Sequence, residues 1–470
     1  MDERQDSVAA APPENGHGAV ILVSSAAALG GFLFGFDTAV INGAVDAIEA
    51  EFAMSAGLLG FVVSSALIGC AVGAWFAGPL SDRHGRLRVM LVAAVLFAVS
   101  AIGSALAVGP ISLTLWRLVG GLAVGAASVI APAYIAEIAP AHLRGRLGSL
   151  QQLAIVTGIF VALLVDYVLA ASAGGAGEDV PWGGTAWRWM FATAALPALV
   201  YGVLALQIPE SPRYLVQKDR LSEARAVLRR FVGGNVDLRI REISRSVGTD
   251  AAAVRLSDLR GPRLGLLPIV WIGILLSVFQ QFVGINVIFY YSTTLWRSVG
   301  FTEENALVIT VITSVTNIVT TLIAISLVDR IGRKPLLVFG AGGMVVTLAT
   351  LAWCFSTATG SGDDVTLGPV VGKVALVAAN LYVVSFGMSW GPVVWVLLGE
   401  MFNNKIRATA LAVAAAAQWV ANWLVSTSFP PLADLGLTFA YALYAGFAAL
   451  ALVFVLRNVQ ETKGRELEDM

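Results

Sequence analysis

Twelve long apolar runs dominate the chain, and short polar loops separate most of them. Each run has about the 20 residues that a helix needs to cross the hydrocarbon core of a bilayer. The expected spans lie near residues 19–43, 57–79, 89–108, 111–136, 148–171, 187–208, 266–298, 304–328, 335–357, 371–399, 408–429 and 435–456. This pattern predicts an all-α membrane protein with twelve transmembrane helices in two six-helix halves.

The one sizeable polar segment covers roughly residues 210–264 and lies between the two halves. Residues 221–231 have apolar side chains at helical spacing and predict an amphipathic helix, and a second short helix is expected at 237–247. The segment is too short for an ordinary catalytic domain, so a gate or latch and a passive tether are the two alternatives. The expected division of the chain is a tail at 1–18, a helical half at 19–208, a linker at 209–264, a second half at 265–457 and a tail at 458–470.

Basic residues follow the even-numbered spans, whereas the alternate loops are acidic or neutral. The basic residues are Arg83, Arg86, Arg88, Arg144, Arg146, Arg330, Arg333, Lys334, Lys405, Arg407, Arg457, Lys463 and Arg465. Loops rich in Lys and Arg tend to stay in the cytoplasm. We therefore expect a protein of the cell membrane with both termini cytoplasmic.

Composition supports a membrane protein and argues against catalysis. Hydrophobic residues make up 57% of the chain and charged residues 13%, whereas soluble domains have about 25% charged residues. The two cysteines, Cys70 and Cys354, both lie in apolar runs, so no disulfide framework is expected. The spans contain no evident cluster of nucleophiles, metal ligands or paired acids. We expect neither an enzyme nor a bound cofactor or metal.

Asp37 is the only ionisable side chain in the first span. A carboxylate at such depth costs about 2.5 to 3.5 kcal/mol on insertion scales, so it is expected to face a cavity or a partner. Arg117, in the fourth span, is the opposite charge, and pairing with it would keep Asp37 ionised. We interpret Asp37 as a proton carrier and Arg117 as its conformational switch, and we expect no second acid at that depth. The alternative is a misjudged helix boundary that leaves Asp37 among lipid headgroups.

Acidic and basic residues at the cytoplasmic helix ends follow the same pattern in both halves, which predicts two parallel repeats. We expect these residues to form a gating charge network that pairs in one conformation and separates in the other. The alternative is that they only set the topology. The candidates are Asp82, Arg83, Arg86, Glu137, Arg144, Glu210, Asp329, Arg330, Arg333, Glu400, Arg407 and Glu461.

Neutral amides concentrate in the spans of the second half, and they suit a sugar, which has many hydroxyls and little charge. They are Gln280, Gln281, Asn286, Asn317, Gln418 and Asn422, and the fifth span adds Gln151 and Gln152. Unpaired amides are costly in a membrane, so their positions are informative. Each amide by itself also fits an interhelical hydrogen bond.

The seventh span must break if Gln280 and Asn286 touch one ligand, because at 100° per residue they point apart on a continuous helix. We expect it to unwind near Gly284, as helices around a midplane site do in transporters. Tyr290 and Tyr291 would then lie in an extracellular gate. A second break is expected in the tenth span at Gly391-Pro392, with Trp395 as a stacking platform for the sugar.

Three motifs resemble the sugar porter branch of the major facilitator superfamily, with a resemblance that runs over about residues 20–466. They are Pro209-Glu-Ser-Pro-Arg213, Gln280-Gln-Phe-Val-Gly-Ile-Asn286 and Glu461-Thr-Lys-Gly464. Gln460 departs from the branch, which commonly has Pro at that position. The resemblance implies the major facilitator fold and transport by alternating access.

The resemblance also implies roles for individual residues. It implies sugar contacts at Gln152, Gln280, Gln281, Asn286, Asn317, Trp395 and Gln418. Proton-coupled members have Asp at the position of Asp37, whereas facilitative members tend to have Asn. Gly387 lies where animal facilitative glucose transporters tend to have Glu and bacterial symporters have small residues.

These features predict a proton-coupled monosaccharide symporter, with D-glucose favoured because the set of amides is complete. The alternatives are a facilitative sugar uniporter, a symporter for xylose or another monosaccharide, an antiporter of the same fold for drugs or metabolites, and a nontransporting sugar sensor. The expected partners are the sugar, the proton and the lipid bilayer, with no nucleic acid. One copy of the chain is expected to function as a monomer.

Overall fold

The computed structural model describes residues 16–140, 143–233, 235–250, 259–262, 265–359, 366–402 and 406–463. Within these ranges, the side chains of residues 16–17, 144–146, 246–250, 329, 399 and 407–408 lie outside the description. Twelve helical segments of the described chain are long and apolar enough to cross a membrane, and each overlaps one expected span. The predicted all-α membrane fold is confirmed.

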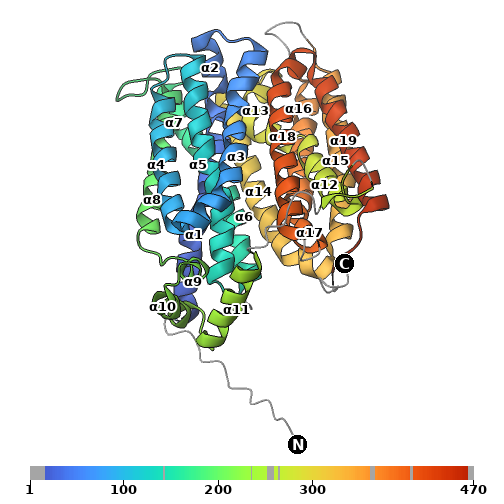
Figure 1. Ribbon diagram of the computed structural model, residues 1–470. Coiled ribbons are helices and arrows are strands. Elements are labelled where there is room, and N and C mark those ends of the chain that lie inside the picture. Colours follow the sequence, from blue (N-terminus) through green and yellow to red (C-terminus); the bar gives the residue numbers. More distant parts are fainter. Residues whose placement is uncertain are drawn as a thin grey trace, which may run out of the picture.

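The first six spans form one half of the molecule (Figure 1). Its helices are α1 (Gly16–Val40), η1 (Asn42–Ala44), α2 (Val45–Phe52), α3 (Ala56–His84), α4 (Arg86–Ala105), α5 (Pro110–Ile138), α6 (Arg144–Ala173), α7 (Ala186–Thr193) and α8 (Ala195–Ala205). The first span runs on through η1 and α2, and α7 and α8 together form the sixth span.

The last six spans form the second half, which lies beside the first (Figure 1). Its helices are α12 (Pro268–Phe282), α13 (Ile285–Arg297), α14 (Glu303–Ile331), α15 (Arg333–Ser356), α16 (Pro369–Gly387), α17 (Trp390–Met401), α18 (Arg407–Asp434) and α19 (Leu437–Asn458). Two of its spans, α12–α13 and α16–α17, are each built from two helices.

Three short helices connect the halves: α9 (Pro212–Gln217), α10 (Leu221–Phe231) and α11 (Val236–Asp250). The two expected helices correspond to α10 and α11, whereas α9 was not predicted. The Ser211 hydroxyl caps α9 by accepting hydrogen bonds from the backbone N–H groups of Arg213 and Tyr214. Apolar side chains that include Leu215, Leu228 and Ile240 form a small core among the three helices.

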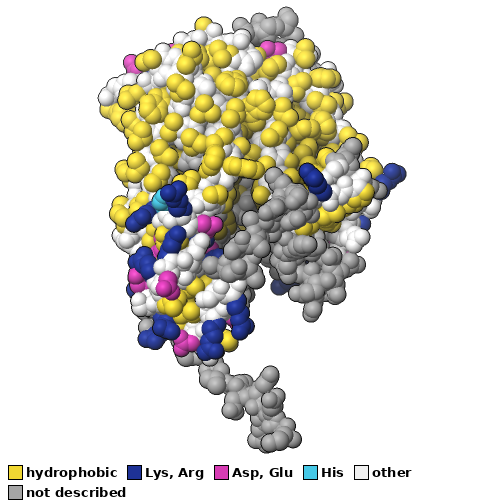
Figure 2. All heavy atoms as spheres, in the orientation of Figure 1, with side chains coloured by type: hydrophobic (Ala, Val, Ile, Leu, Met, Phe, Trp, Pro, Cys, Tyr) yellow, Lys and Arg dark blue, Asp and Glu magenta, His cyan; other side chains and the backbone are white. Residues whose placement is uncertain are grey.

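The start of α1, the end of α19 and the helices α9–α11 all lie toward one end of the molecule (Figure 1). We call this the linker end. The opposite end, where η1 and α2 lie, is called the distal end. On the face shown in Figure 2, hydrophobic side chains cover most of the distal part, and Lys and Arg side chains gather toward the linker end.

Glycine allows the helices of the first half to pack backbone against backbone. A Cβ atom on Gly35 of α1 would lie 1.9 Å from the carbonyl oxygen of Ile155 in α6. A Cβ atom on Gly121 of α5 would lie 2.0 Å from the carbonyl oxygen of Ala66 in α3. Neither position can hold a larger residue without moving a helix. These contacts position the segment of α1 that carries Asp37.

The hydrogen bonds that join the two halves gather toward the distal end. The Ser64 and Thr427 hydroxyls lie 2.6 Å apart and link α3 to α18, and the Ala176 N–H donates to the Glu303 carboxylate of α14 at 2.8 Å. A Cβ atom on Gly60 would lie 2.3 Å from the carbonyl oxygen of Thr427, so α3 and α18 touch there without a side chain between them. The distal end is therefore closed by direct contact between the halves.

Candidate functional site

Asp37 and Arg117 form an ion pair inside the first half. An Nη1 hydrogen of Arg117 on α5 donates to the Asp37 carboxylate of α1 at 3.2 Å. The Arg117 side chain is 2% exposed and the Asp37 side chain 15%. The two charges are therefore withdrawn from bulk water and face each other, as the sequence predicts.

The rest of the Arg117 guanidinium is held by neutral groups. Its Nη2 donates to the Val63 carbonyl oxygen of α3 at 3.2 Å, and its carbon lies 5.9 Å from the centre of the Phe191 ring. Its Nε has no hydrogen-bond partner among the residues that the structure describes. Asp37 is the one carboxylate bonded to this guanidinium among the described residues, so loss of its charge would leave Arg117 without its counter-ion.

The expectation of no second acid at this depth is wrong, because Asp166 of α6 is fully buried inside the fifth span. One of its carboxylate oxygens accepts a hydrogen bond from the Gly43 N–H at 3.2 Å, and the other has no partner in the described part of the chain. The signal in the sequence was the same as for Asp37: a single acid within an apolar run.

The seventh span breaks where the sequence predicts. α12 ends at Phe282, α13 begins at Ile285, and Gly284 between them has a φ of 85°, which L side chains rarely adopt. The Tyr382 hydroxyl donates to the carbonyl oxygen of Val283 at 2.7 Å, so this backbone group is satisfied although no helix continues past it.

The break brings three predicted sugar contacts into one chain of hydrogen bonds. The Asn286 amide donates to the Gln281 side-chain oxygen at 2.6 Å, and the Gln281 amide donates to the Gln280 oxygen at 3.4 Å. The Gln280 amide donates to the carbonyl oxygens of Trp390 and Gly391 at 2.8 and 3.2 Å. Gln280 and Gln281 are buried, and Asn286 is half-buried.

The tenth span also breaks, but earlier than expected. α16 ends at Gly387 and α17 begins at Trp390, with a non-helical Ser389 before it, so Gly391-Pro392 lies within the first turn of α17. A proline in the first turn needs no backbone N–H partner, which is why it does not break the helix there.

Trp390 rather than Trp395 lies beside the amide chain. Trp395 is 41% exposed, and no described contact places it near Gln280. Trp390 is fully buried, accepts the Gln280 hydrogen bond and donates its indole N–H to the Leu337 carbonyl oxygen at 3.0 Å. The sequence does not single out Trp390, because it predicts a break after this residue, at Gly391-Pro392, whereas the break lies before it at Ser389.

The remaining predicted contacts are spread over three helices. Gln152 on α6 is half-buried, Asn317 on α14 is buried, and Gln418 on α18 has a buried side-chain oxygen without a hydrogen-bond partner. No described hydrogen bond links them to the Gln280 chain. A Cβ atom on Gly387 would lie 2.4 Å from the Thr320 hydroxyl and 3.3 Å from the Asn317 oxygen, so only glycine fits there without a shift.

Aromatic side chains lie next to Gln418 in the sequence and beside the break at Gly284. Trp419, next to Gln418, packs edge-on against Phe34 of the first half with ring centres 5.5 Å apart. Tyr441 and Tyr444 of α19 have buried hydroxyls without partners, and the Tyr444 ring lies beside Gly284. Orphaned hydroxyl and amide oxygens next to aromatic faces match the donors and acceptors that a sugar requires, and none of these four aromatic residues was singled out from the sequence.

Tyr290 and Tyr291 are buried in α13, next to the contact between the halves. The helix is kinked at Tyr291, whose hydroxyl donates to the Ser426 carbonyl oxygen of α18 at 2.9 Å. α13 packs against α1, η1 and α2 of the other half. This places both tyrosines in the helix that closes the distal end, where the sequence predicts a gate.

Polar bonds from α13 to the first half complete this closure. The Asn42 amide donates to the Phe289 carbonyl oxygen at 3.0 Å, and its oxygen accepts from the Thr293 backbone N–H and hydroxyl at 3.2 and 2.5 Å. Asp46 accepts from the Thr294 hydroxyl and from the Arg297 guanidinium, both at 2.6 Å. We call these six residues the distal gate, and none of them was expected in a gate from the sequence.

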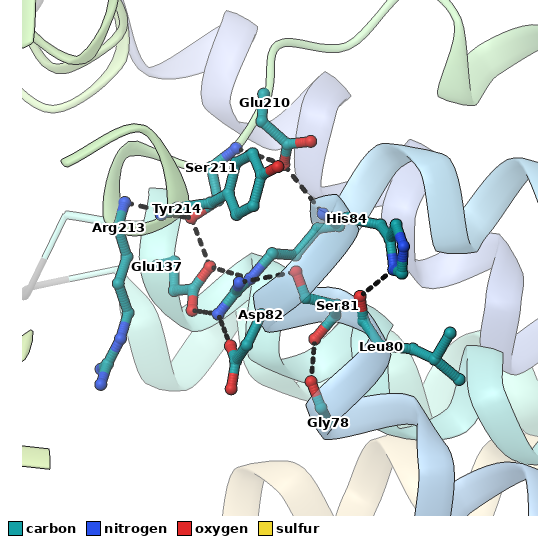
Figure 3. A network of polar contacts seen from close by, with 11 residues as sticks. Gly78, Leu80, Ser81, Asp82, His84, Glu137, Glu210, Ser211, Arg213 and Tyr214 are labelled. Carbon is teal, nitrogen blue, oxygen red and sulfur yellow. Dashed lines mark hydrogen bonds and ion pairs between the residues drawn. The ribbon is translucent and has the colours of Figure 1, made fainter. Parts of the chain in front are cut away.

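At the linker end, the first half carries a cluster around Arg86. The guanidinium binds both oxygens of Glu137 at 2.9 and 3.1 Å and lies 3.0 Å from Asp82. Glu210 accepts from the backbone N–H groups at the start of α4, and the Ser211 hydroxyl donates to Glu137. Figure 3 shows Glu137 of α5 meeting Glu210 and Ser211 of the segment that leads into α9.

The second half repeats the cluster around Arg333. Its guanidinium binds both oxygens of Glu400 at 2.7 and 3.0 Å, and Glu461 accepts from the backbone N–H groups of Arg333 and Lys334 at 3.0 Å each. The Thr462 hydroxyl donates to Glu400 at 2.7 Å, in the place that Ser211 has in the first half. The two predicted repeats therefore share one hydrogen-bonding pattern.

Burial by itself would raise the pKa of Glu461, but four backbone N–H donors outweigh it and lower that pKa below its usual value. The donors belong to Lys463, Arg333, Lys334 and Thr462. The negative charge of Glu461 is thus held at the N-terminus of α15, where the helix dipole also favours it.

Several predicted network members stand apart from these clusters. Arg83 and Arg330 have exposed side chains that form no ion pair in the described structure. The side chains of Arg144, Asp329 and Arg407 lie outside the described residues. The described ion pairs of each cluster stay within one half. The hydroxyls of Ser211 and Thr462 join them, although these two motif residues were not expected in the charge network.

Comparisons with known proteins agree with this geometry. The family model described as "Sugar (and other) transporter" matches residues 23–470. A glucose transport protein of Synechocystis sp. is 60% identical over 96% of this chain and 97% of its own length. The D-xylose-proton symporter of Escherichia coli is 38% identical over 96% of this chain and 95% of its own.

The fold matches a solved transporter over nearly the whole chain. The xylose transporter XylE from E. coli, in a partially occluded inward-open conformation, superposes with a TM-score of 0.82 and 37% identity. The match covers 96% of this chain and all of that one. The chain therefore belongs to the sugar porter family of the major facilitator superfamily, and it is a monosaccharide transporter rather than an enzyme.

Proposed function

We propose that the protein is a proton-coupled symporter that takes a monosaccharide, D-glucose in the first place, into the cell. The ion pair of Asp37 and Arg117 is the observation that carries this proposal. It gives the first half one titratable carboxylate whose partner is a buried cation in a different helix. Protonation of Asp37 removes its charge and leaves Arg117 without its counter-ion, and this change in charge balance inside the first half couples proton binding to the conformational equilibrium.

Sugar binding is assigned to the amides and aromatic rings of the second half. Gln280, Gln281 and Asn286 form a connected set of donors and acceptors, and the orphaned oxygen of Gln418 adds another. Gln152 and Asn317 extend this set from neighbouring helices. Trp395, which is 41% exposed, is retained as the stacking platform for the sugar, and the Trp390 backbone carbonyl oxygen holds the Gln280 amide. The similarity to a glucose transport protein supports D-glucose over other monosaccharides.

The linker end is assigned to the cytoplasm because basic residues gather there. Both termini are then cytoplasmic, and the distal gate faces outward. Since the distal end is closed, the structure corresponds to an inward-facing state, in agreement with its similarity to an inward-open xylose transporter. One chain contains both halves and all of the assigned residues, so a monomer is sufficient for this mechanism.

The transport cycle follows from these assignments. In the outward-facing state Asp37 takes up a proton and releases Arg117, and sugar binds to the amides. The halves then close at the distal end and separate at the linker end. Sugar and proton leave into the cytoplasm, and Asp37 pairs with Arg117 again.

The gate and cluster residues take part in this movement. Tyr290 and Tyr291 move with α13 as it packs against the first half. The repeated clusters around Arg86 and Arg333 keep each half rigid. Their part in gating is to make the linker end of each half move as one unit.

The test compares the wild-type protein with Asp37→Asn in sealed vesicles. We expect Asp37→Asn to lose sugar accumulation driven by a pH gradient while it keeps sugar exchange at equal concentrations, because the amide cannot carry a proton. Glu223→Gln, in an exposed pair with Arg220, is the control. Undiminished accumulation by Asp37→Asn would exclude Asp37 as the proton carrier.

Two further measurements in the same vesicles test the alternatives. A wild-type protein that causes no external alkalinisation on sugar addition would be the facilitative uniporter. Competition by unlabelled xylose, galactose and fructose identifies the preferred sugar.

A further inference from the structure

Asp166 is a buried acid that the transport mechanism above does not use. It lies in α6 with no exposed surface, and its only described hydrogen bond comes from the Gly43 N–H at 3.2 Å. Gly43 is the middle residue of η1, the short turn that follows α1. The second carboxylate oxygen has no hydrogen-bond partner among the described residues.

Gly43 and Asp166 touch more closely than this one bond requires. A Cβ atom on Gly43 would lie 2.6 Å from the Asp166 Cβ, 2.8 Å from its Cγ and 2.9 Å from its Oδ2. The turn therefore rests directly on the carboxylate group. Any side chain at position 43 would push η1 away from α6.

The residue before Gly43 is the one that bridges the two halves. The Asn42 side-chain amide bonds to α13 through both its nitrogen and its oxygen. The nitrogen donates to the Phe289 carbonyl oxygen, and the oxygen accepts from the Thr293 backbone N–H and hydroxyl. These bonds require the Asn42 backbone to keep one position and orientation relative to α13, because each hydrogen bond weakens steeply when misaligned. Asp166 is the side chain that holds the neighbouring peptide group of η1.

The charged side chains near this region have other partners. Asp46 pairs with Arg297 across the gate, and Glu303 accepts from the Ala176 N–H. Arg188 on α7 pairs with Glu51 and also binds the carbonyl oxygens of Ala105 and Ala107. Asp37 on α1 is bonded to Arg117. None of them forms an ion pair with Asp166, so its described role is that of a hydrogen-bond acceptor.

We infer that Asp166 is a positioning residue of the distal gate: it holds η1 through the Gly43 N–H so that Asn42 can bridge to α13. The bond between Gly43 and Asp166 lies within one half and can persist in both states. The Asn42 bridge joins both halves and exists only when the distal end is closed. Loss of the Asp166 acceptor therefore weakens the closed state selectively. This inference rests on alternating access, but not on the assignment of Asp37.

The experiment measures gate closure rather than transport. Spin labels at Val108→Cys and Leu435→Cys report the distance between the halves at the distal end, since both native side chains are well exposed in loops of different halves. The native cysteines, Cys70 and Cys354, are buried. The full-length labelled protein is studied in lipid nanodiscs by double electron–electron resonance, with Asp166→Leu as the test and Asp166→Asn as the conservative control.

We expect Asp166→Leu to raise the ratio of open to closed distal ends by about tenfold, the effect of one lost buried hydrogen bond. Asp166→Asn retains an acceptor oxygen for the Gly43 N–H and is expected to match the parent protein. Asn42→Ala should open the gate as well, and adding Asp166→Leu to it should change little, because both act through the same bridge. If Asp166→Leu does not fold, Gly43→Ala tests the same contact and should open the gate in the same direction.

Three outcomes would overturn the inference. An unchanged distance distribution in Asp166→Leu and in Gly43→Ala would show that the contact does not position the gate. Equal opening in Asp166→Asn and Asp166→Leu would assign the effect to the charge or proton of the carboxyl instead. Fully additive effects of Asn42→Ala and Asp166→Leu would show that Asp166 acts by another route. Failure of Asp37 as proton carrier would leave each of these results unaffected.

Discussion

Three acids of this transporter show that the partner of a carboxylate, rather than its burial, decides what the residue can do. Asp37 faces the Arg117 guanidinium, Asp166 faces a single backbone N–H, and Glu461 gathers four backbone N–H donors. An ion pair between two helices is lost when its carboxylate takes up a proton. A carboxylate bonded to the backbone of one turn holds that turn in place, and one with four donors remains charged.

Glu461 leads to a prediction about pH. Because its pKa in the folded protein is below the ordinary value of 4.5, its contribution to stability is complete above that value and is lost as the pH falls through the lowered pKa. We expect Glu461→Gln to lower the unfolding free energy at pH 7 by about 1 kcal/mol, the scale of a charge-assisted hydrogen bond partly replaced by a neutral one.

The measurement is thermal unfolding of the purified protein between pH 7 and pH 3. The difference between wild type and Glu461→Gln should shrink as the pH falls below 4.5. Glu304→Gln, at an exposed position in the first turn of α14, is the control and should track the wild type throughout. A difference that grows on acidification would contradict the assignment.

At the scale of elements, breaks and close contacts determine how the helices move. The αL residue Gly284 separates α12 from α13, and Ser389 precedes α17, so both broken spans meet near the Gln280 amide. Gly60 lets α3 touch the backbone of α18 at the distal end. A helix that ends beside the site can tilt without unwinding, whereas a backbone contact without side chains allows the halves to close fully.

The contact at Gly60 predicts a defect in closing rather than in binding. Gly60→Val places a side chain 2.3 Å from the Thr427 carbonyl oxygen when the distal end is closed, at a cost of about 1 to 3 kcal/mol. We expect sugar exchange to slow by about tenfold or more, while equilibrium sugar binding from the outside remains.

Counterflow in vesicles measures the exchange, and calorimetry measures the binding. Gly57→Val is the matched control, because it lies one turn earlier in α3 and a Cβ atom there meets nothing within 4 Å. Equal exchange rates in the two variants would show that α3 and α18 do not need this approach.

At the scale of the whole molecule, the two halves repeat one arrangement of charges. Arg86 with Glu137 and Arg333 with Glu400 tie the start of one helix to the end of another in each half. The two arginines are largely buried. Each is the cation that balances the charge of its carboxylate partner. The halves can thus rotate against each other as separate rigid units.

This duplication predicts matched and independent effects. Arg86→Gln and Arg333→Gln each leave a carboxylate without its cation, and we expect each to destabilise the protein by about 2 to 4 kcal/mol, near the cost of breaking a buried pair. The double variant should show the sum within about 0.5 kcal/mol, because the two sites share no partner.

Thermal or denaturant unfolding of the four proteins gives the comparison, and Arg83→Gln, at an exposed position with no ion pair, is the control. A strongly non-additive double variant would mean that the two clusters interact across the halves. In that case they would form a single gate rather than two rigid ends.

The sequence by itself determined the twelve spans, the two halves, the amphipathic helix α10 and the break at Gly284. Each of these depends on neighbouring residues: a run of apolar side chains has only one low-energy way to cross a bilayer, and a glycine between polar positions marks where that run must bend. The amides and the Asp37–Arg117 pair were also identified in this way, because polar side chains in a membrane stand out against an apolar background.

Only the tertiary structure decided which polar side chains meet. Trp390 rather than Trp395 adjoins Gln280 because the tenth span breaks at Ser389, and that break depends on packing against other helices. Ser211, Thr462 and Asn42 find their partners between 62 and 251 positions away in the chain. Asp166 was visible as an acid in an apolar run, but its role required the position of η1. Contacts between distant segments depend on how the helices pack in three dimensions, and a local pattern carries no information about that.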